Sequence, residues 1–555
     1  MKGGRAMKSW SLPFLCIGAL LVSMLVPGGY ATAQRLPIQF PRNNITPYGP
    51  YAIDGTYMLG EKEMDLRKRA AQIGPVLATG VSSVAMPATI GEGLTITVSD
   101  LGLGTEYAEE FVVVMNGTHG IILVEKKAYD NYDEANHEYV FPNPFGCFRL
   151  EDRISTAQLE YLLEQFDTVI YPTNTSVFGE PLPRGDEDEA KKTWILIHNI
   201  RDESYYYGPS DQDDRCDPET FTYIAGYFSA SEDTANNKNM IHIDSGDWER
   251  RIGPGVEFPY MYETVFAHEF EHLLHFDRDP DESLWIDEGL ANLAAFLCGY
   301  GHQAQFIAYY LVFHPITSLT YWGGGLQDYG STYLFALYLY EHFGGTPFIS
   351  ALVQEQANGI EGIEKALTAF GYHDTFDEIF DNWTIANYLD DTRKKGGKYG
   401  YENLEIGSID TWGYSIEYAL SNLWWGPPNA APFSVPSNWF YGIEPQPYTA
   451  HYFRFNNKKA AQVSIDGDDF AGILDNGFGV TTIDTKWVPT AIYPEPAGNN
   501  AMQLHNVSTL TVDPDTQAGE DRVSATPSKS GRVKVSIVTN HADHILPSHY
   551  DFGVK

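Results

Sequence analysis

The chain is poor in cysteine and in basic residues, and each shortage narrows the classes of protein to which it can belong. Its four cysteines have a spacing that fits no cysteine-based zinc module. Lys and Arg number 36 against 74 Asp and Glu, so the formal net charge is −38. The phosphates of nucleic acid or of anionic lipid would repel such a polyanion, so we expect neither as a partner. The charge favours solubility in extracellular surroundings over an acidic recognition surface.

Long apolar runs are also missing, apart from one near the N-terminus. Lys2, Arg5 and Lys8 precede the apolar residues 12–26, and three small residues follow at 31–33. This order predicts a secretory signal peptide over residues 1–33. The apolar run is shorter than the ~20 residues that span a membrane, and no later segment offers such a run. We therefore expect a secreted protein without a membrane anchor.

The cysteines allow at most one internal disulfide. Cys16 would leave with the signal peptide. Cys147 and Cys216 lie in loop-like sequence, and we expect them to pair. Cys298 lies in an apolar helical pattern, which predicts a buried free thiol.

The remaining chain divides by composition. The length of 555 residues suits three or four domains. Strand patterns around a helix at 156–166 predict an α/β part, and a long helical pattern follows it. We expect an α+β catalytic domain followed by an all-β sandwich. The predicted parts are an N-terminal extension or propeptide at 34–92, the α/β upper part at 93–260, the helical lower part at 261–425, a linker at 426–447 and the β-sandwich at 448–555.

The most informative pattern is a predicted helix over residues 263–276. His268 and His272 are four positions apart, so they lie on one face of that helix one turn apart. Two imidazoles in this arrangement can hold one Zn²⁺ ion at about 2.0–2.1 Å. Glu269 points away from the ligand line, where it can act on a metal-bound water. This is the H-E-x-x-H pattern, and its alternative is a helix with two exposed or core histidines.

A third ligand is required, because catalytic zinc sites use three protein ligands and one water. Glu288, on a second predicted helix at 285–297, lies sixteen positions after His272, which leaves room for a loop. Gly289 would permit close helix approach. His275 is a weaker candidate, since one straight helix cannot wrap three turns around one ion, and Asp287 would point about 100° away from Glu288.

These residues resemble the gluzincin metallopeptidases. HEFEH at 268–272 followed by WIDEGLA at 285–291 looks like that clan, whose third ligand is the Glu of a W-x-x-E-G segment. Within it, the chain is most similar to the secreted hyicolysin-type and immune-inhibitor-A-type peptidases. The similarity spans roughly residues 94–343, and includes FDTVIYPTNTSVFGEP at 166–181, AGYF at 225–228 and DYGSTYLF at 328–335. A metzincin would need Gly at 275 and His at 278, where this chain has His and Arg.

The resemblance implies a fold and a reaction. The fold would be zincin-like, with an α/β upper part whose edge strand holds the substrate. The chain has none of the G-A-M-E-N run of the clan's aminopeptidases, which favours an endopeptidase acting on proteins or peptides. The alternatives are an exopeptidase of the same clan, and a surface or glycan-binding protein on a non-catalytic scaffold.

The expected site has three kinds of residue. His268, His272 and Glu288 would hold Zn²⁺, and Glu269 would be the general base. Tyr329 matches the family's tyrosine and would donate to the oxyanion, although a structural tyrosine is an equal alternative. Two further residues would lie in the second shell: Asn292, orienting a ligand histidine, and His275, which could also lie at the rim. Acidic runs at 211–217 and 466–469 could bind Ca²⁺, but solvated loops are the simpler interpretation.

Overall fold

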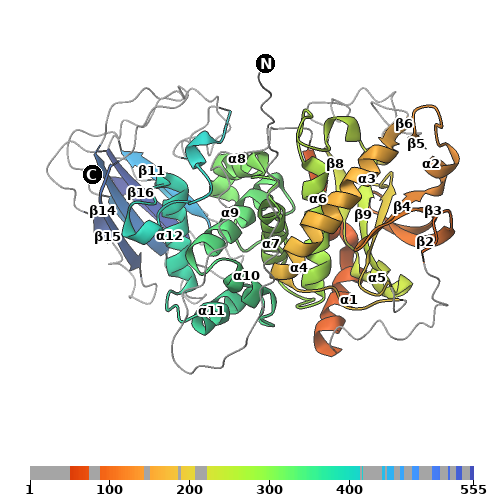
Figure 1. Cartoon of the computed structure of the whole chain (residues 1–555). Coiled ribbons are helices and arrows are strands. Elements are labelled where there is room, and N and C mark those ends of the chain that lie inside the picture. The colour runs from red at the N-terminus through yellow and green to blue at the C-terminus, as the bar shows by residue number, and fades with distance from the viewer. Residues whose placement is uncertain are drawn as a thin grey trace, which may run out of the picture. The chain divides into compact units, whose positions relative to one another are not determined.

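The computed structural model (Figure 1) describes most of the chain from residue 51 onward. The predicted signal peptide, the calcium-binding interpretation of both acidic runs, and the pairing of Cys147 with Cys216 lie outside the residues or side chains that it describes. The described residues are 51–73, 88–142, 151–185, 189–206, 222–412, 416, 440–443, 447–455, 463–467, 478–486, 503–512, 523–525, 533–540 and 550–554.

A mixed seven-stranded sheet forms the centre of the first half of the described chain. Strands β4, β7 and β9 are parallel to one another, and β8 runs antiparallel to β9. Strand β1 pairs with β8 in parallel and forms one edge of the sheet. In spatial order the strands are β1 (Tyr51–Asp54), β8 (Thr222–Tyr227), β9 (Asn239–Asp244), β7 (Thr193–His198), β4 (Gly120–Glu125), β3 (Thr105–Asn116) and β2 (Gly93–Asp100).

The central strands are apolar because both faces of the sheet are covered. In β4, Ile122 and Val124 belong to the large core that includes the helices, whereas Ile121 and Leu123 belong to a smaller cluster on the opposite face. Buried parallel strands are typically continuous apolar runs of this kind. On the large-core side, α6 (Met261–Phe276) contacts β8 and β9, as Figure 1 shows. The sheet therefore supports the helix that carries the two histidines.

The helix predicted at 156–166 is the first part of a longer helical segment. Helix α3 (Thr156–Gln165) begins at a capping box formed by Ser155 and Gln158. It continues through a π-helical turn at Phe166–Ile170 into α4 (Tyr171–Phe178). Pro172 is the second residue of α4, directly after the π-helical turn. The other elements of this half are α1 (Gly60–Ile73), α2 (Lys126–Asp130), α5 (Ala230–Asn236), β5 (Glu138–Pro142) and β6 (Glu151–Ser155).

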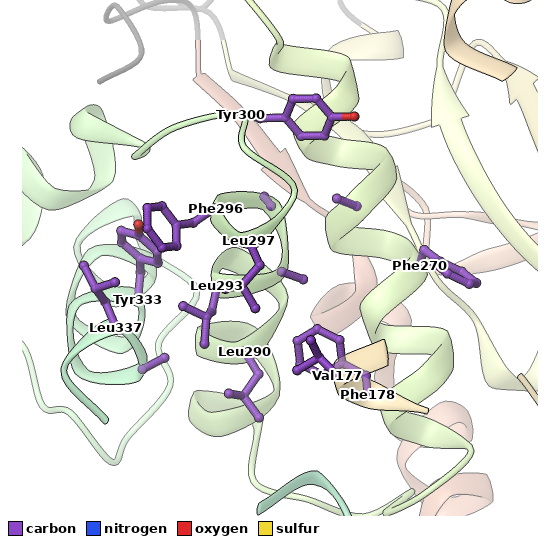
Figure 2. Close-up of a cluster of buried hydrophobic side chains, with 14 of the residues drawn as sticks. Val177, Phe178, Phe270, Leu290, Leu293, Phe296, Leu297, Tyr300, Tyr333 and Leu337 are labelled. Carbon is purple, nitrogen blue, oxygen red and sulfur yellow. The ribbon is translucent and has the colours of Figure 1, made fainter. Parts of the chain in front are cut away.

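Helix α7 (Leu284–Leu297) is the core of the helical half. Every residue from 285 to 297 is buried. Figure 2 shows its apolar side chains between α6 on one side and Tyr333 and Leu337 of α9 (Leu326–His342) on the other. No helix of the described residues is both long and apolar enough for a membrane span. The remaining helices are α8 (Ala304–Phe313), α10 (Thr346–Val353), α11 (Gly359–Ala369) and α12 (Phe376–Leu389).

The C-terminal residues form two four-stranded antiparallel sheets. One boundary differs from the sequence prediction, because β10 lies inside the linker expected at 426–447. Its aromatic and β-branched residues pair with β17, a partner that the Pro-rich surroundings do not reveal. The first sheet has the strand order β10 (Phe440–Ile443), β17 (Tyr550–Val554), β12 (Val463–Gly467) and β15 (Val523–Ala525). The second sheet has the strand order β11 (Ala450–Phe455), β16 (Val533–Asn540), β13 (Phe478–Lys486) and β14 (Gln503–Val512).

Candidate metal centre

Two adjacent helices bring three potential metal ligands together. His268 and His272 lie one turn apart on α6, and their Nε2 atoms are 3.1 Å apart. Glu288, in the first half of α7, places Oε2 3.4 Å from His268 Nε2 and 3.8 Å from His272 Nε2. All three side chains are buried. The structure therefore brings together the three residues that the sequence pattern selects as ligands.

The spacing of these atoms fits a zinc ion. Ligands at 2.0–2.1 Å from a tetrahedral ion lie about 3.4 Å from one another. The three separations of 3.1, 3.4 and 3.8 Å lie around this value. Both carboxylate oxygens of Glu288 are buried without a hydrogen-bond partner. A buried carboxylate in this state requires a cation or a proton to offset its lost hydration, so the donor set suits a divalent metal.

The titration behaviour of the site follows from burial and from crowded negative charge. Burial, followed by the charges of Asp54 and Asp287, raises the pKa of Glu288 well above its usual value. Burial and the charge of Asp54 do the same to the pKa of Glu269. Burial and the neighbouring His272 lower the pKa of His268 to about 3. His268 is therefore neutral at physiological pH, which is the form in which imidazole binds a metal.

Asp287 orients one of the ligand histidines. Its Oδ1 lies 3.0 Å from His272 Nδ1, which leaves Nε2 directed toward Glu288 and His268. The same carboxylate receives Arg67 Nη1 at 3.2 Å and lies 3.2 Å from His275 Nδ1. Burial opposes the charged form, but His272 and His275 hold the pKa of Asp287 well below its usual value. An ionised carboxylate on the far nitrogen fixes the tautomer of a ligand histidine.

The two residues expected to support the ligands, Asn292 and His275, occupy different positions. Asn292 donates to the Glu288 carbonyl oxygen at 3.0 Å and accepts from Gln303 Nε2 at 2.7 Å, so its side chain binds the backbone of the ligand-bearing α7, and its orientation of a ligand histidine stays a prediction. His275 is buried, with Nδ1 3.3 Å from Glu271 Oε1 and 3.2 Å from Asp287 Oδ1. It therefore does not lie at a rim. It reaches the ligand His272 through Asp287 and through Glu271, whose Oε2 lies 3.9 Å from His272 Nδ1.

The expected general base and oxyanion donor both face the N-terminal strand. Glu269 Oε2 lies 3.4 Å from the Thr56 hydroxyl. The Tyr329 hydroxyl, on α9, donates to the Asp54 carbonyl oxygen at 3.3 Å. The roles of Glu269 and Tyr329 stay predictions. Burial, followed by the charges of Glu288 and Asp54, raises the pKa of the Tyr329 hydroxyl well above its usual value.

Gly289 permits the close approach that positions Glu288. A Cβ atom on Gly289 would lie 2.8 Å from the Thr332 carbonyl oxygen of α9. Real Cβ atoms do not approach a backbone oxygen so closely, so any larger residue would force α7 and α9 apart. The role predicted for this glycine is correct, although the helix it approaches is α9. Cys298 is a free cysteine, half-buried at the end of α7, where burial raises the pKa of its thiol.

Two residues around the ligands could not be identified from the sequence. Asp287 was set aside because it points away from Glu288, yet that direction leads to the far nitrogen of His272. No local sequence pattern marks Asp54 as a potential metal ligand. It lies in the predicted N-terminal extension, more than 200 positions before His268, and the structure places its carboxylate with His268, His272 and Glu288 in one group of potential metal ligands.

Comparisons with known proteins add no family assignment. No family model and no curated protein matches the chain. One solved structure in the comparison is a family GH115 4-O-methyl-α-glucuronidase with specificity for decorated arabinogalactans, at 8% sequence identity and a TM-score of 0.13. The alignment covers 68% of this chain and 54% of that enzyme. A likeness at this TM-score supports no conclusion on fold or function.

Proposed function

We propose that the chain is a secreted zinc-dependent metalloendopeptidase that hydrolyses peptide bonds in proteins or peptides. The observation that carries the proposal is the triangle of His268 Nε2, His272 Nε2 and Glu288 Oε2, with sides of 3.1, 3.4 and 3.8 Å. These buried donors have the chemistry and spacing of a catalytic zinc site. The resemblance of residues 268–272 and 285–291 to the gluzincins supports the same reaction.

The metal would supply Lewis-acid polarisation of the peptide carbonyl and would lower the pKa of its bound water. Glu269 is adjacent to a ligand on α6 and is buried, with its pKa raised well above the usual value by burial and by Asp54. A carboxylate with a raised pKa is a better proton acceptor. It would take a proton from the attacking water and pass it to the leaving amine.

Tyr329 would bind the carbonyl oxygen of the scissile peptide. Its hydroxyl already donates to a backbone carbonyl, that of Asp54, at 3.3 Å. A donor that binds a carbonyl oxygen there can also stabilise the negative charge that develops on such an oxygen during attack. The ring is buried and stacks on Phe306, which fixes the position of the hydroxyl. This orientation requires no rearrangement during the reaction.

The architecture around the site supports a zincin-like fold. Strand β8 lies beside α6 and runs antiparallel to its inner neighbour β9. It would present the edge on which an extended peptide adds as a further strand. The ligand-bearing α6 and α7 then lie below that edge, so a peptide bound there would pass the metal ligands.

The proposal is tested by zinc analysis combined with digestion of unfolded casein. We expect about one zinc per chain in the wild type and in Glu269→Gln, with the Glu269→Gln rate lower by about 10²–10⁴-fold. His272→Ala should lose the zinc, because removing one of three ligands opens the site. Glu160→Gln, an exposed glutamate on α3, is the matched control and should change neither quantity.

The outcomes also separate the alternatives. A zinc-loaded chain that cuts no unfolded protein, either intact or with Asp54 replaced by Asn, would refute a peptidase function. Cleavage confined to chain ends would favour an exopeptidase. Internal cleavage that disappears in Glu269→Gln supports the endopeptidase.

A further inference from the structure

The N-terminal segment, residues 51–73, supplies a fourth buried donor to the metal centre. The Asp54 carboxylate, His268, His272 and Glu288 each offer one atom, and these atoms all lie within 4.8 Å of one another. Thr56 fixes the orientation of this carboxylate through its backbone N–H at 2.9 Å and its hydroxyl at 2.7 Å. Catalytic zinc sites keep one position open for water or substrate. Four protein donors would leave no such position.

The same segment contacts the two residues proposed to act on the substrate. The Tyr329 hydroxyl donates to the Asp54 carbonyl oxygen at 3.3 Å. The Thr56 hydroxyl lies 3.4 Å from Glu269 Oε2. The backbone carbonyl of Asp54 therefore lies where a substrate carbonyl would meet Tyr329, and the Thr56 hydroxyl lies beside Glu269, where the attacking water would lie.

The strand of the segment also fills the sheet edge that a substrate would use. Strand β1 pairs with β8, with Tyr51 opposite Thr222 and Ile53 opposite Ile224. The pairing continues past the strand, because Gly55 N donates to the Gly226 carbonyl oxygen at 2.9 Å. An extended peptide needs these backbone groups of β8 in order to add to the sheet. While β1 is in place, the edge is not available.

Helix α1 anchors the segment with buried ion pairs. Arg67 Nη1 lies 3.2 Å from Asp287 Oδ2, and Arg67 Nε lies 3.2 Å from Glu63 Oε1. The Glu63 carboxylate also accepts from the backbone N–H groups of Ala230 and Ser231, at the start of α5. The anchor thus reaches Asp287, the residue that orients His272. All of these contacts are non-covalent, so the segment can leave without breaking a bond in the rest of the fold.

We propose that Asp54 is a fourth metal ligand and that the N-terminal segment holds the enzyme latent by occupying the metal, the oxyanion donor and the substrate edge together. This inference rests on the proposed function, because latency requires an activity to suppress. Displacement of the segment frees the fourth ligand position, the Tyr329 hydroxyl and the edge of β8 in one step. The segment is thereby an internal regulator of the same site.

The test uses the intact chain loaded with Co²⁺ in place of Zn²⁺, in a Glu269→Gln background that prevents self-cleavage. Mass spectrometry verifies that Asp54 is still present. Asp54→Asn keeps an acceptor for Thr56, and Asp54→Ala removes it. Asp65→Asn is the matched control, because Asp65 is exposed on α1 of the same segment. The measurements are the visible absorption spectrum of the cobalt and the Kd of acetohydroxamate, a small bidentate metal ligand.

We expect both Asp54 variants to change the cobalt spectrum and to bind acetohydroxamate at least about tenfold more tightly than the parent, because a closed site weakens apparent affinity in proportion to its open fraction. Asp65→Asn should match the parent. Loss of the Asp54–metal bond removes one of the contacts that hold the segment, so β1 should leave β8 more often. With Glu269 restored, Asp54→Asn should therefore digest casein at least about tenfold faster than the intact wild type.

The outcomes distinguish this inference from the proposed function. Equal spectra and equal acetohydroxamate affinities in the parent, Asp54→Asn and Asp65→Asn, with one metal per chain, would overturn the fourth ligand and leave the metal site intact. Equal casein rates would overturn latency while the endopeptidase remains. A changed spectrum without any proteolysis supports the ligand and refutes the peptidase. A chain that binds no metal refutes both proposals.

Discussion

Replacement of Asp287 by Asn tests whether the ligand histidine depends on its outer partner. The carboxylate lies 3.0 Å from His272 Nδ1 and also pairs with Arg67 and His275. Asn keeps the shape but loses the charge, so it neither fixes the His272 tautomer nor raises the basicity of the imidazole. Loss of such a partner typically weakens metal binding by about 10–100-fold, which is about 1.4–2.7 kcal/mol. We expect a zinc affinity lowered by this factor.

The assay is competition for zinc between the protein and a chromophoric chelator at constant pH. Asp277→Asn is the matched control, because Asp277 is also buried and paired with an arginine, Arg184, but follows the end of α6. It should lower the melting temperature and leave zinc affinity unchanged. Circular dichroism checks that both variants are folded. A folded Asp287→Asn variant with wild-type zinc affinity would refute the argument that this carboxylate supports His272.

Three further predictions concern catalysis and stability. Tyr329→Phe, in an Asp54→Asn background, should lower kcat on a fluorogenic peptide by about 10²–10³-fold with unchanged zinc content, because one oxyanion donor is lost; an unchanged kcat would leave Tyr329 a structural residue. Burial raises the pKa of Glu125 to about 7, so the folded state retains a proton that the unfolded state releases above its pKa of about 4.5, and stability falls as the pH rises between these values. In Glu125→Gln this fall is absent. The unfolding free energy of the variant, relative to that of the wild type, should therefore rise by about 2.5 kcal/mol from pH 5 to pH 8, as measured by urea denaturation. A difference that does not depend on pH would contradict this prediction. Gly330→Ala should cost about 3 kcal/mol, since the new Cβ would lie 2.0 Å from the Phe306 carbonyl oxygen; an unchanged urea midpoint would show that α8 and α9 can separate freely.

The elements that carry the ligands could be predicted because their signals are local. The helices expected at 263–276 and 285–297 correspond to α6 (Met261–Phe276) and α7 (Leu284–Leu297). Apolar periodicity and the four-residue spacing of the histidines are properties of one turn of helix, so they require no knowledge of the fold. Helical periodicity also predicts that Asp287 points away from Glu288. It does not predict that the Asp287 carboxylate contacts His272.

The parts that could not be predicted depend on contacts between distant segments. Nothing near Asp54 marks it as a residue of the metal centre, because its neighbours there belong to α6 and α7. The sequence around Arg67 likewise suggests an exposed charge on a helix, whereas in the structure Arg67 is buried and pairs with Asp287. Strand β10 pairs with β17, which lies more than 100 residues later in the chain. In each case tertiary contacts decide the structure, and local propensity is too weak to reveal them.

The pairing of β1 with β8 has a consequence for how the protein folds. Tyr51 lies opposite Thr222, so about 170 residues must be made before the partner of this early strand exists. Contacts between such distant residues are entropically costly and form slowly. The edge of the sheet, and with it the four-donor cluster, is therefore completed late. The chain gains these contacts only after most of the sheet has been synthesised, so the earliest strand of the described residues is among the last to pair.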